Sequence, residues 1–196
     1  MKKRITLSII FLVILVGGIT IGIKGQATTL EEALDFSSLA PMKVIHEEKL
    51  EEGSLFFCFN EKEDTIYTAF IKKTINGYKN LYSGVEGDAT YAANRLDFTQ
   101  TYFPAIEKTS LPVYFGLIGN DEIKEIKVKE LGRNEVGESA KIIETAVGRL
   151  WLQPMTEYSG SRFEIQALSE DGQLIKQIET SIAPWAADDE PKPSAY

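Results

Sequence analysis

The chain opens on nineteen residues without a charge, from Ile5 to Ile23. Basic residues stand on both sides of this run: Lys2, Lys3, Arg4 and Lys24. A helix that rises about 1.5 Å per residue would be about 28 Å long here, close to the roughly 30 Å hydrocarbon core of a bilayer. We therefore predict a transmembrane signal-anchor over residues 1–24. Its membrane-spanning part includes Ile5, Phe11, Val16 and Ile23.

The flanking charges predict how this anchor is oriented. Three basic residues precede the run and one follows it, so the positive-inside rule places the N-terminus in the cytoplasm and the rest of the chain outside the cell membrane. The alternative is a secreted protein cleaved near Ala27, because Gly25, Gln26 and Ala27 form a small-x-small sequence. We favour the retained anchor, since the apolar stretch of a signal peptide is only about 7–15 residues long.

Two glycines in the run have the spacing of paired membrane helices. Gly18 and Gly22 form a Gly-x-x-x-Gly pair, which lets two helix backbones approach closely. One interpretation is a dimer through this face. The other is that the two glycines reflect only the high glycine content of membrane helices.

The charge beyond the anchor excludes one class of partner. The net charge of the whole chain is -8, but residues 25–196 carry 17 basic and 29 acidic residues, a net charge of -12. Such a surface repels phosphate backbones, so we expect no nucleic-acid partner. It suits a basic protein patch, or anionic wall polymers bridged by divalent cations. Cys58 is the only cysteine, so no intramolecular disulfide can form.

The pattern beyond residue 24 is that of a mainly β fold, a β-rich α+β chain. Residues 25–41 form a connector with a short helix over 28–38, because Thr29 and Glu32 fit a capping box and Pro41 ends the pattern. Residues 42–112 form an antiparallel β-meander and an irregular aromatic segment. Residues 113–182 form a second β module, or complete one sandwich with the first. Residues 183–196 form a disordered tail.

Periods of two residues and turn signals place the strands. In the meander we expect strands at 42–47, 54–60, 65–73 and 78–84, followed by a short helix at 90–96. In the second module we expect strands at 113–118, 123–128, 140–145, 149–153, 163–168 and 174–179. Asn76-Gly77 and Asp171-Gly172 are strong hairpin signals. Residues 55–59 are apolar on both faces, which predicts a central strand.

Several segments are similar to those of a known group of proteins. A short helix precedes residues 44–48 (Val-Ile-His-Glu-Glu), an aromatic strand, residues 69–73 (Ala-Phe-Ile-Lys-Lys) and residues 77–79 (Gly-Tyr-Lys). Residues 114–118 (Tyr-Phe-Gly-Leu-Ile) and an Asp-x-Ile-x-x-Ile-x-Val pattern from residue 121 follow. This order resembles uncharacterised small membrane-anchored or secreted proteins of Gram-positive spore-forming bacteria. The resemblance spans most of residues 29–180 and implies an extracytoplasmic, bacterial, β-rich domain, with no functional residues to transfer.

The sharpest catalytic candidates are His46 and Cys58. A two-residue turn would place Glu47 opposite Cys58 and His46 opposite Phe59, and a shift of one residue would bring His46 across from Cys58. An imidazole beside a thiol is how a cysteine nucleophile is activated. The phenylalanines around Cys58 instead predict a buried, inert thiol. With no motif for a serine hydrolase, a phosphate loop or a zinc site, we predict no catalytic residue, no metal and no cofactor.

Four carboxylates gather on the first predicted hairpin: Glu47, Glu48, Glu51 and Glu52. Calcium needs six to eight converging oxygens, and the spacing matches no calcium loop. We therefore interpret this cluster as a solvated turn.

The aromatic segment holds the candidates for ligand binding, namely Tyr91, Phe98 and Tyr102. Exposed aromatic rings stack on sugars or anchor protein partners. The alternative is that these rings cover the open face of the meander.

Two hypotheses for the function follow. The first is a non-enzymatic, membrane-anchored extracytoplasmic domain that binds a protein or a cell-wall component. The second is a small extracytoplasmic hydrolase that acts on wall glycan or peptide through carboxylates, since such sites leave no local signature.

Overall fold

The computed structural model describes residues 27–34, 42–104, 112–132 and 136–182. The chain divides into two compact units, residues 1–85 and 86–196, which we call unit 1 and unit 2. The fold is mainly β with antiparallel sheets, as predicted. Within the described ranges no helix is both long and apolar enough to cross a bilayer. The predicted anchor, its Gly18–Gly22 pair and the predicted tail lie outside the described residues.

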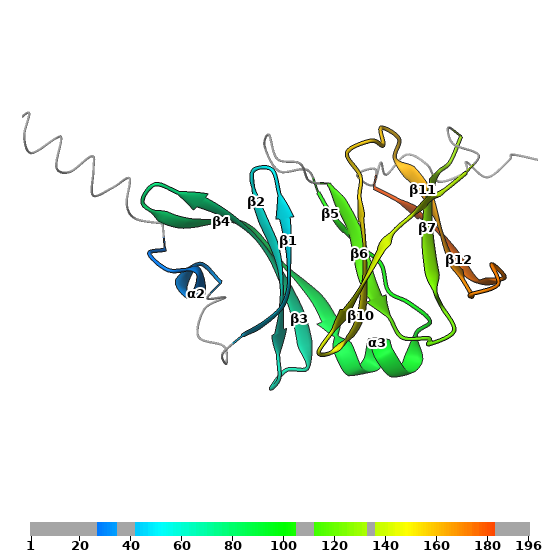
Figure 1. Ribbon diagram of the computed structural model, residues 1–196, viewed down its shortest axis with the longest axis horizontal. Coiled ribbons are helices and arrows are strands. Elements are labelled where there is room, and N and C mark those ends of the chain that lie inside the picture. The colour runs from blue at the N-terminus through cyan, green and yellow to red at the C-terminus, as the bar shows by residue number, and fades with distance from the viewer. Residues whose placement is uncertain (1–26, 35–41, 105–111, 133–135, 183–196) are drawn as a thin grey trace, which may run out of the picture. The chain divides into compact units, whose positions relative to one another are not determined.

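Unit 1 is one antiparallel sheet in the order β1-β2-β3-β4, the predicted meander (Figure 1). Its strands are β1 (Lys43–Leu50), β2 (Gly53–Asn60), β3 (Thr65–Thr74) and β4 (Gly77–Asp88). Gly77 begins β4 with a φ of 128°, a conformation that favours glycine. The last three residues of β4 belong to unit 2.

The two faces of this sheet are buried in different ways. On one face, which we call the helix face, Phe56 and Cys58 of β2 and Ala69 of β3 form a core cluster with Ala33 and Leu34. On the opposite face the alternate side chains of β2 and β3 are also buried: Leu55, Phe57, Ile66, Thr68 and Phe70. The central, doubly covered strand predicted for residues 55–59 is therefore present as β2.

A four-residue helix covers part of the helix face. This helix, α2 (Leu30–Ala33), begins after Thr29, whose hydroxyl accepts a hydrogen bond from Glu32 N at 3.2 Å. The Glu32 carboxylate in turn accepts from Thr28 N at 2.7 Å and from Thr29 N at 3.4 Å. The predicted capping box is confirmed, and these hydrogen bonds hold the pKa of Glu32 below its ordinary value, the Thr28 hydroxyl contributing most.

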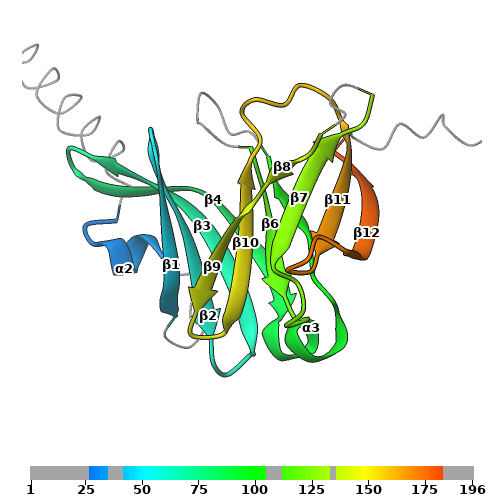
Figure 2. The same ribbon diagram turned by 45° about the vertical axis from the view of Figure 1, so that its right-hand side comes forward.

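Unit 2 contains two four-stranded sheets. The first has the order β5-β6-β10-β9 and the second β12-β11-β7-β8. The strands are β5 (Thr101–Phe103), β6 (Val113–Ile118), β7 (Glu125–Glu130), β8 (Glu138–Ser139), β9 (Lys141–Thr145), β10 (Gly148–Pro154), β11 (Arg162–Leu168) and β12 (Leu174–Ser181). Figure 2 shows β8 running directly into β9, so this segment passes from one sheet to the other.

The inner faces of both sheets meet in one core. Trp151 of β10 is fully buried, packs edge to face against Phe98, and donates a hydrogen bond from Nε1 to Thr99 O at 2.8 Å. From the other sheet, Phe163 and Ile165 join the same cluster, and the inward alternation predicted for β11 is confirmed. Unit 2 is thus a β-sandwich.

The segment at residues 86–112 belongs to unit 2, although the sequence grouped it with the meander. Its helix is α3 (Ala89–Arg95), close to the prediction, with Asp88 Oδ1 accepting from Tyr91 N at 2.7 Å as the N-cap. Strand β5 then pairs with β6, and Phe98 enters the sandwich core. These long-range contacts, rather than any local signal, set the boundary at Val85.

Candidate binding groove

Unit 1 has an open groove on its helix face, with a volume of about 850 Å³. The register explains its position. Lys49 of β1 lies opposite Ser54 of β2, and Ser54 lies opposite Ile71 of β3, so these three residues form one row across the sheet. Helix α2 packs on the neighbouring rows, and no other described residue outside the groove lining is recorded over this end of the sheet.

The floor of the groove is apolar. Phe56 and Ile71 are buried beneath it, and Tyr78 of β4 and Leu30 of α2 border it half-buried. Tyr78 is fixed by two backbone hydrogen bonds with Ala27, one of 2.9 Å from Ala27 N to Tyr78 O and one of 2.8 Å from Tyr78 N to Ala27 O. The floor therefore offers a rigid apolar surface to a ligand.

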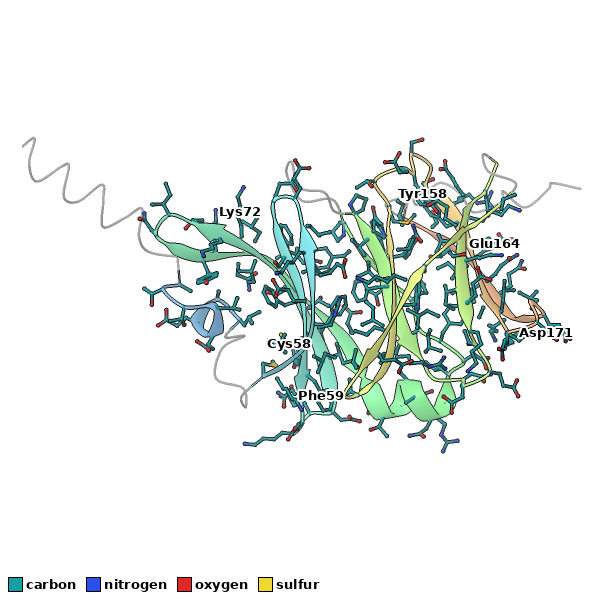
Figure 3. The ribbon with its side chains drawn as sticks, viewed as in Figure 1. Cys58, Phe59, Lys72, Tyr158, Glu164 and Asp171 are labelled. Carbon is teal, nitrogen blue, oxygen red and sulfur yellow. The ribbon has the colours of Figure 1, made fainter. Side chains whose placement is uncertain are left out.

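Charged side chains line the rim of the groove in two groups. Over β1 and the β1–β2 turn stand three carboxylates, Glu47, Glu51 and Glu52. Ser54 Oγ donates to Glu47 Oε1 at 2.7 Å and so orients that carboxylate. At the end of β3 stand Lys72 and Lys73, both exposed (Figure 3 labels Lys72). By alternation Lys73 shares the groove face with Ile71, whereas the Lys72 side chain points to the other face.

The rim lysines are available to a ligand. Across the described part of the chain, Lys72, Lys73 and Lys49 make no ion pair.

The four carboxylates predicted as one cluster are separated by the sheet. Glu48 points to the face opposite the groove, where its carboxylate lies 3.0 Å from His46 Nε2. The other three carboxylates border the groove. In the described ranges no three His, Cys, Asp or Glu side chains come together in a way that could hold a metal ion.

The predicted register of His46 and Cys58 is wrong. His46 lies opposite Phe57, with ring centroids 6.0 Å apart, and Cys58 lies opposite Val44. The two-residue turn lies at Glu51–Glu52, one position earlier than predicted, and a bulge between Val44 and His46 shifts the pairing beyond it. Paired residues share a face, so the imidazole and the thiol point to opposite faces of the sheet and cannot form a dyad.

Cys58 instead belongs to the core beneath α2. Its side chain is fully buried, and Figure 3 shows it on the α2 side of the sheet. Burial raises the pKa of the thiol to about 12, which keeps it protonated and unreactive at neutral pH.

The three predicted binding aromatics do not form one exposed surface. Tyr91 on α3 is 58% exposed, whereas Phe98 is 9% exposed and packs on Trp151. Tyr102 stacks on Tyr114 with ring centroids 5.0 Å apart and lies against the same core. Only Tyr91 is open to a ligand.

Unit 2 also contains a buried carboxylate, Glu130, which is 3% exposed. The loop between β10 and β11 folds over it: Ser159 N donates to Glu130 Oε2 at 3.4 Å, and Gly160 passes so close that an added Cβ would lie 2.3 Å from Oε1. Tyr158, from the same loop, donates to Val128 O at 3.2 Å. These contacts pin the loop to the end of β7, so Glu130 is a structural anchor rather than an accessible catalytic acid.

A smaller hollow of about 530 Å³ lies beside Arg149 in unit 2. The Arg149 guanidinium donates to the backbone oxygens of Ile123 and Asn120, both at 2.7 Å. It is committed to holding the β6–β7 connection, so we assign no binding role to this hollow.

The sequence did not identify the groove. Lys72, Lys73 and Tyr78 flank the Asn76-Gly77 hairpin signal, and the alternation of β3 could have placed Ile71 and Lys73 on one face. The missing information was the length of α2, which decides how much of that face stays uncovered.

Comparison with known proteins found no relative. No family model, curated protein or solved structure matches the chain. The groove itself is therefore the basis for the function.

Proposed function

We propose that this chain is a non-enzymatic, membrane-anchored extracytoplasmic protein that binds a protein segment or a cell-wall component in the groove of unit 1. The observation that carries this proposal is the groove itself, with its apolar floor and its charged rim. A concave apolar surface with a few charged groups at its rim is the usual form of a ligand site. An origin among the membrane-anchored or secreted proteins of Gram-positive bacteria is part of the same proposal.

The predicted anchor would determine where the groove lies in the cell. Ala27, which is hydrogen-bonded to the groove residue Tyr78, comes three positions after Lys24 at the end of the predicted span. Three extended residues reach about 10 Å. A retained anchor would therefore hold the groove close to the outer membrane face, where wall precursors and membrane proteins are concentrated.

The test is site-specific photo-crosslinking in intact cells. We would place a photoreactive residue at Lys73, on the rim, and in a matched variant at Lys62, which is exposed on the β2–β3 turn away from the groove. We expect one discrete product from position 73 and none from position 62. Equal labelling at both positions, or no product at position 73, would refute the proposal.

A carboxylate hydrolase is the second candidate, because the same groove holds Glu47, Glu51 and Glu52. The two functions respond differently to substitution. Replacing each carboxylate by glutamine should reduce binding in graded steps in a binding protein, whereas a hydrolase should lose all turnover at one or two positions. Incubation of the purified chain with wall fragments, followed by mass spectrometry of the products, separates them directly.

A further inference from the structure

The β3–β4 hairpin of unit 1 projects beyond the rest of its sheet. The paired residues of β2 and β3 end at Ser54 and Ile71, so residues 72–74 of β3 pair with β4 alone. Figure 1 shows this hairpin extending away from the β1–β2 turn. Its tip is a two-residue turn at residues 75–76, where the apolar side chain of Ile75 is fully exposed.

Two lysines face each other across this hairpin. Because the turn is two residues long, the strand positions on either side of it pair by counting outward. Lys73 then pairs with Tyr78, in agreement with the groove, whose rim both residues line. The next pair is Lys72 with Lys79, both exposed and, within the described ranges, without an ion pair. The Cβ atoms of such a pair lie about 5 Å apart and like charges there repel, so this position favours an anion.

The hairpin is basic in an otherwise acidic part of the chain. Residues 65–85 contain three lysines and no acidic residue, whereas residues 25–196 carry a net charge of -12. Glu51 and Glu52 lie at the same end of the sheet, but in the β1–β2 turn, past which the β3–β4 hairpin runs. An exposed isoleucine beside a lysine pair complements a bilayer that contains acidic lipids, because the bilayer is apolar inside and anionic at its surface. A soluble polyanion would engage the lysines but leave Ile75 in water.

The start of unit 1 connects this hairpin to the predicted membrane span. Ala27 pairs with Tyr78, which lies three residues from Ile75. Ala27 also comes three positions after Lys24. Each link of three residues reaches about 10 Å and paired strands lie about 5 Å apart, so Ile75 is at most about 25 Å from Lys24. The hairpin tip is therefore within reach of the bilayer surface from which the predicted span emerges.

We infer that the tip of the β3–β4 hairpin docks on the bilayer, where Ile75 enters the interface and Lys72 and Lys79 bind the headgroups of acidic lipids. This inference rests on the membrane anchoring in the proposed function and adds a second point of contact with the membrane. Two points of contact fix the orientation of the groove relative to the bilayer. The groove stays open, because its floor lies on the face of the sheet opposite to Lys72 and Lys79.

The test uses the full chain in nanodiscs of phosphatidylcholine, alone or in an equal mixture with phosphatidylglycerol. A nitroxide is attached to Asn76→Cys, beside Ile75, and in a matched chain to Lys62→Cys, in the β2–β3 turn. β3 has ten residues, so these two turns lie about 30 Å apart. Cys58 is buried and does not take the label. We expect the nitroxide at position 76 to gain contact with oxygen and lose contact with an aqueous nickel chelate, most strongly in the mixture, and the nitroxide at position 62 to stay in water.

Further variants of the chain labelled at position 76 separate the two parts of the contact. In the mixed lipids Lys72→Gln/Lys79→Gln should lower the ratio of docked to undocked hairpin by about ten-fold or more. The control Lys43→Gln/Lys62→Gln removes the same charge from exposed sites at the other end of the sheet and should leave this ratio unchanged. Ile75→Ser should reduce oxygen contact in both lipids. An equal effect of the two lysine pairs, or no effect of Ile75→Ser, would refute docking.

The outcomes separate docking from the proposed function. If the nitroxide at position 76 stays in water in both lipids while the chain remains in the nanodiscs, docking is wrong and the anchored binding protein stands. If the chain does not remain in the nanodiscs, the anchoring fails and docking fails with it. If soluble polyglutamate shields position 76 as well as the mixed bilayer does, the lysines bind a polyanion and the bilayer assignment is wrong. Photo-crosslinking at position 73 tests the groove separately.

Discussion

Units 1 and 2 both consist of four-stranded antiparallel sheets, but they cover those sheets differently. Unit 2 packs two sheets on each other and fills the space between them with large side chains such as Trp151 and Phe163. Unit 1 has a single sheet, and among the residues that the structure describes its helix face is covered by the four helical residues of α2 and their flanks. A sandwich buries its own inner faces, whereas the described part of α2 covers the helix face of unit 1 only in part, and the groove lies beside it.

A pair of matching turns makes the comparison sharper. Thr74–Gly77 in unit 1 and Thr145–Gly148 in unit 2 both end in a glycine with positive φ, 128° and 119°. In each, the threonine hydroxyl donates to the glycine carbonyl oxygen, at 3.1 Å and 2.6 Å. Only at Gly77 does a second segment, Ala27, approach closely. The two turns thus have similar geometry and differ mainly in whether a second segment packs against the glycine.

The largest effect is expected at the sandwich core. Trp151→Ala should destabilise unit 2 by about 3–5 kcal/mol, because it leaves a cavity beside Phe98 and removes the donor to Thr99 O. Hydrogen exchange should show lost protection in β6, β7, β10 and β11, with β2 and β3 retained. Trp151→Phe, which keeps most of the volume, should cost less. Equal loss of protection in both units would mean that they unfold as one, and the contrast drawn between the two units would be wrong.

The matched turns give the next prediction. Gly77→Ala and Gly148→Ala both force alanine into a left-handed conformation, at a cost of roughly 1–2 kcal/mol. At Gly77 the added Cβ would lie 2.2 Å from Ala27 O, whereas at Gly148 it would meet nothing within 4 Å. Gly77→Ala should therefore cost about 1–3 kcal/mol more. Hydrogen exchange of the strands flanking each turn measures this difference, and equal costs would show that the Ala27 contact contributes nothing.

The burial of Cys58 predicts how the stability of the fold changes with pH. The buried thiol holds its proton up to a pKa of about 12, and in the unfolded chain it releases it near the ordinary value of 9.0. Unfolding therefore releases a proton above pH 9. The contribution of the buried thiol to the free energy of unfolding is intact below pH 9 and is lost as the pH rises towards 12. At pH 10 the loss in the free energy of unfolding is on the order of 1 kcal/mol.

The control for Cys58 is the variant Cys58→Ala. Denaturant titrations at pH 8 and pH 10 should show a smaller fall in stability for this variant than for the parent, since other groups titrate equally in both. A thiol reagent at pH 8 should label the parent only after unfolding. Rapid labelling of the native chain would contradict the burial of Cys58.

The smallest effect is expected at the cap of α2. Glu32→Gln should loosen the first turn, because Glu32 accepts bonds from Thr28 and Thr29. The pKa of Glu32 is lowered, so the support it gives is present above its ordinary value of 4.5 and disappears as the pH falls through the lowered value. Amide exchange at Ala33 and Leu34 should quicken slightly in Glu32→Gln. The neighbouring change Glu31→Gln should leave exchange unchanged, and a larger effect there would argue against the capping box.

The sequence predicted local features better than distant ones. Alternation and turn residues located most strands of both units, and the Asn76-Gly77 signal placed the β3–β4 hairpin correctly. Strands β5 and β8 were missed, because three and two residues carry no usable period and exist only through their partners β6 and β7.

The site was harder to predict than the fold. The position of the two-residue turn sets the pairing of His46 with Phe57, and a bulge at Ile45 then sets the pairing of Val44 with Cys58. The sequence therefore left open whether His46 and Cys58 could meet, and it missed the groove. Phe98 and Tyr102 looked like exposed aromatics because their core partners Trp151 and Tyr114 lie far along the chain.

The β-bridge between Ala27 and Tyr78 would be present in the membrane-anchored form of this protein and absent from a form cleaved just after Ala27. β4 is an edge strand, and Ala27 satisfies one donor and one acceptor of that edge. A peptidase that cut after Ala27 would remove this rung and leave the backbone of Tyr78 unpaired. An open edge is a template for another strand, so the released form would gain a tendency to self-associate that the tethered form lacks. Cleavage of this one peptide bond would thus change the self-association of the protein.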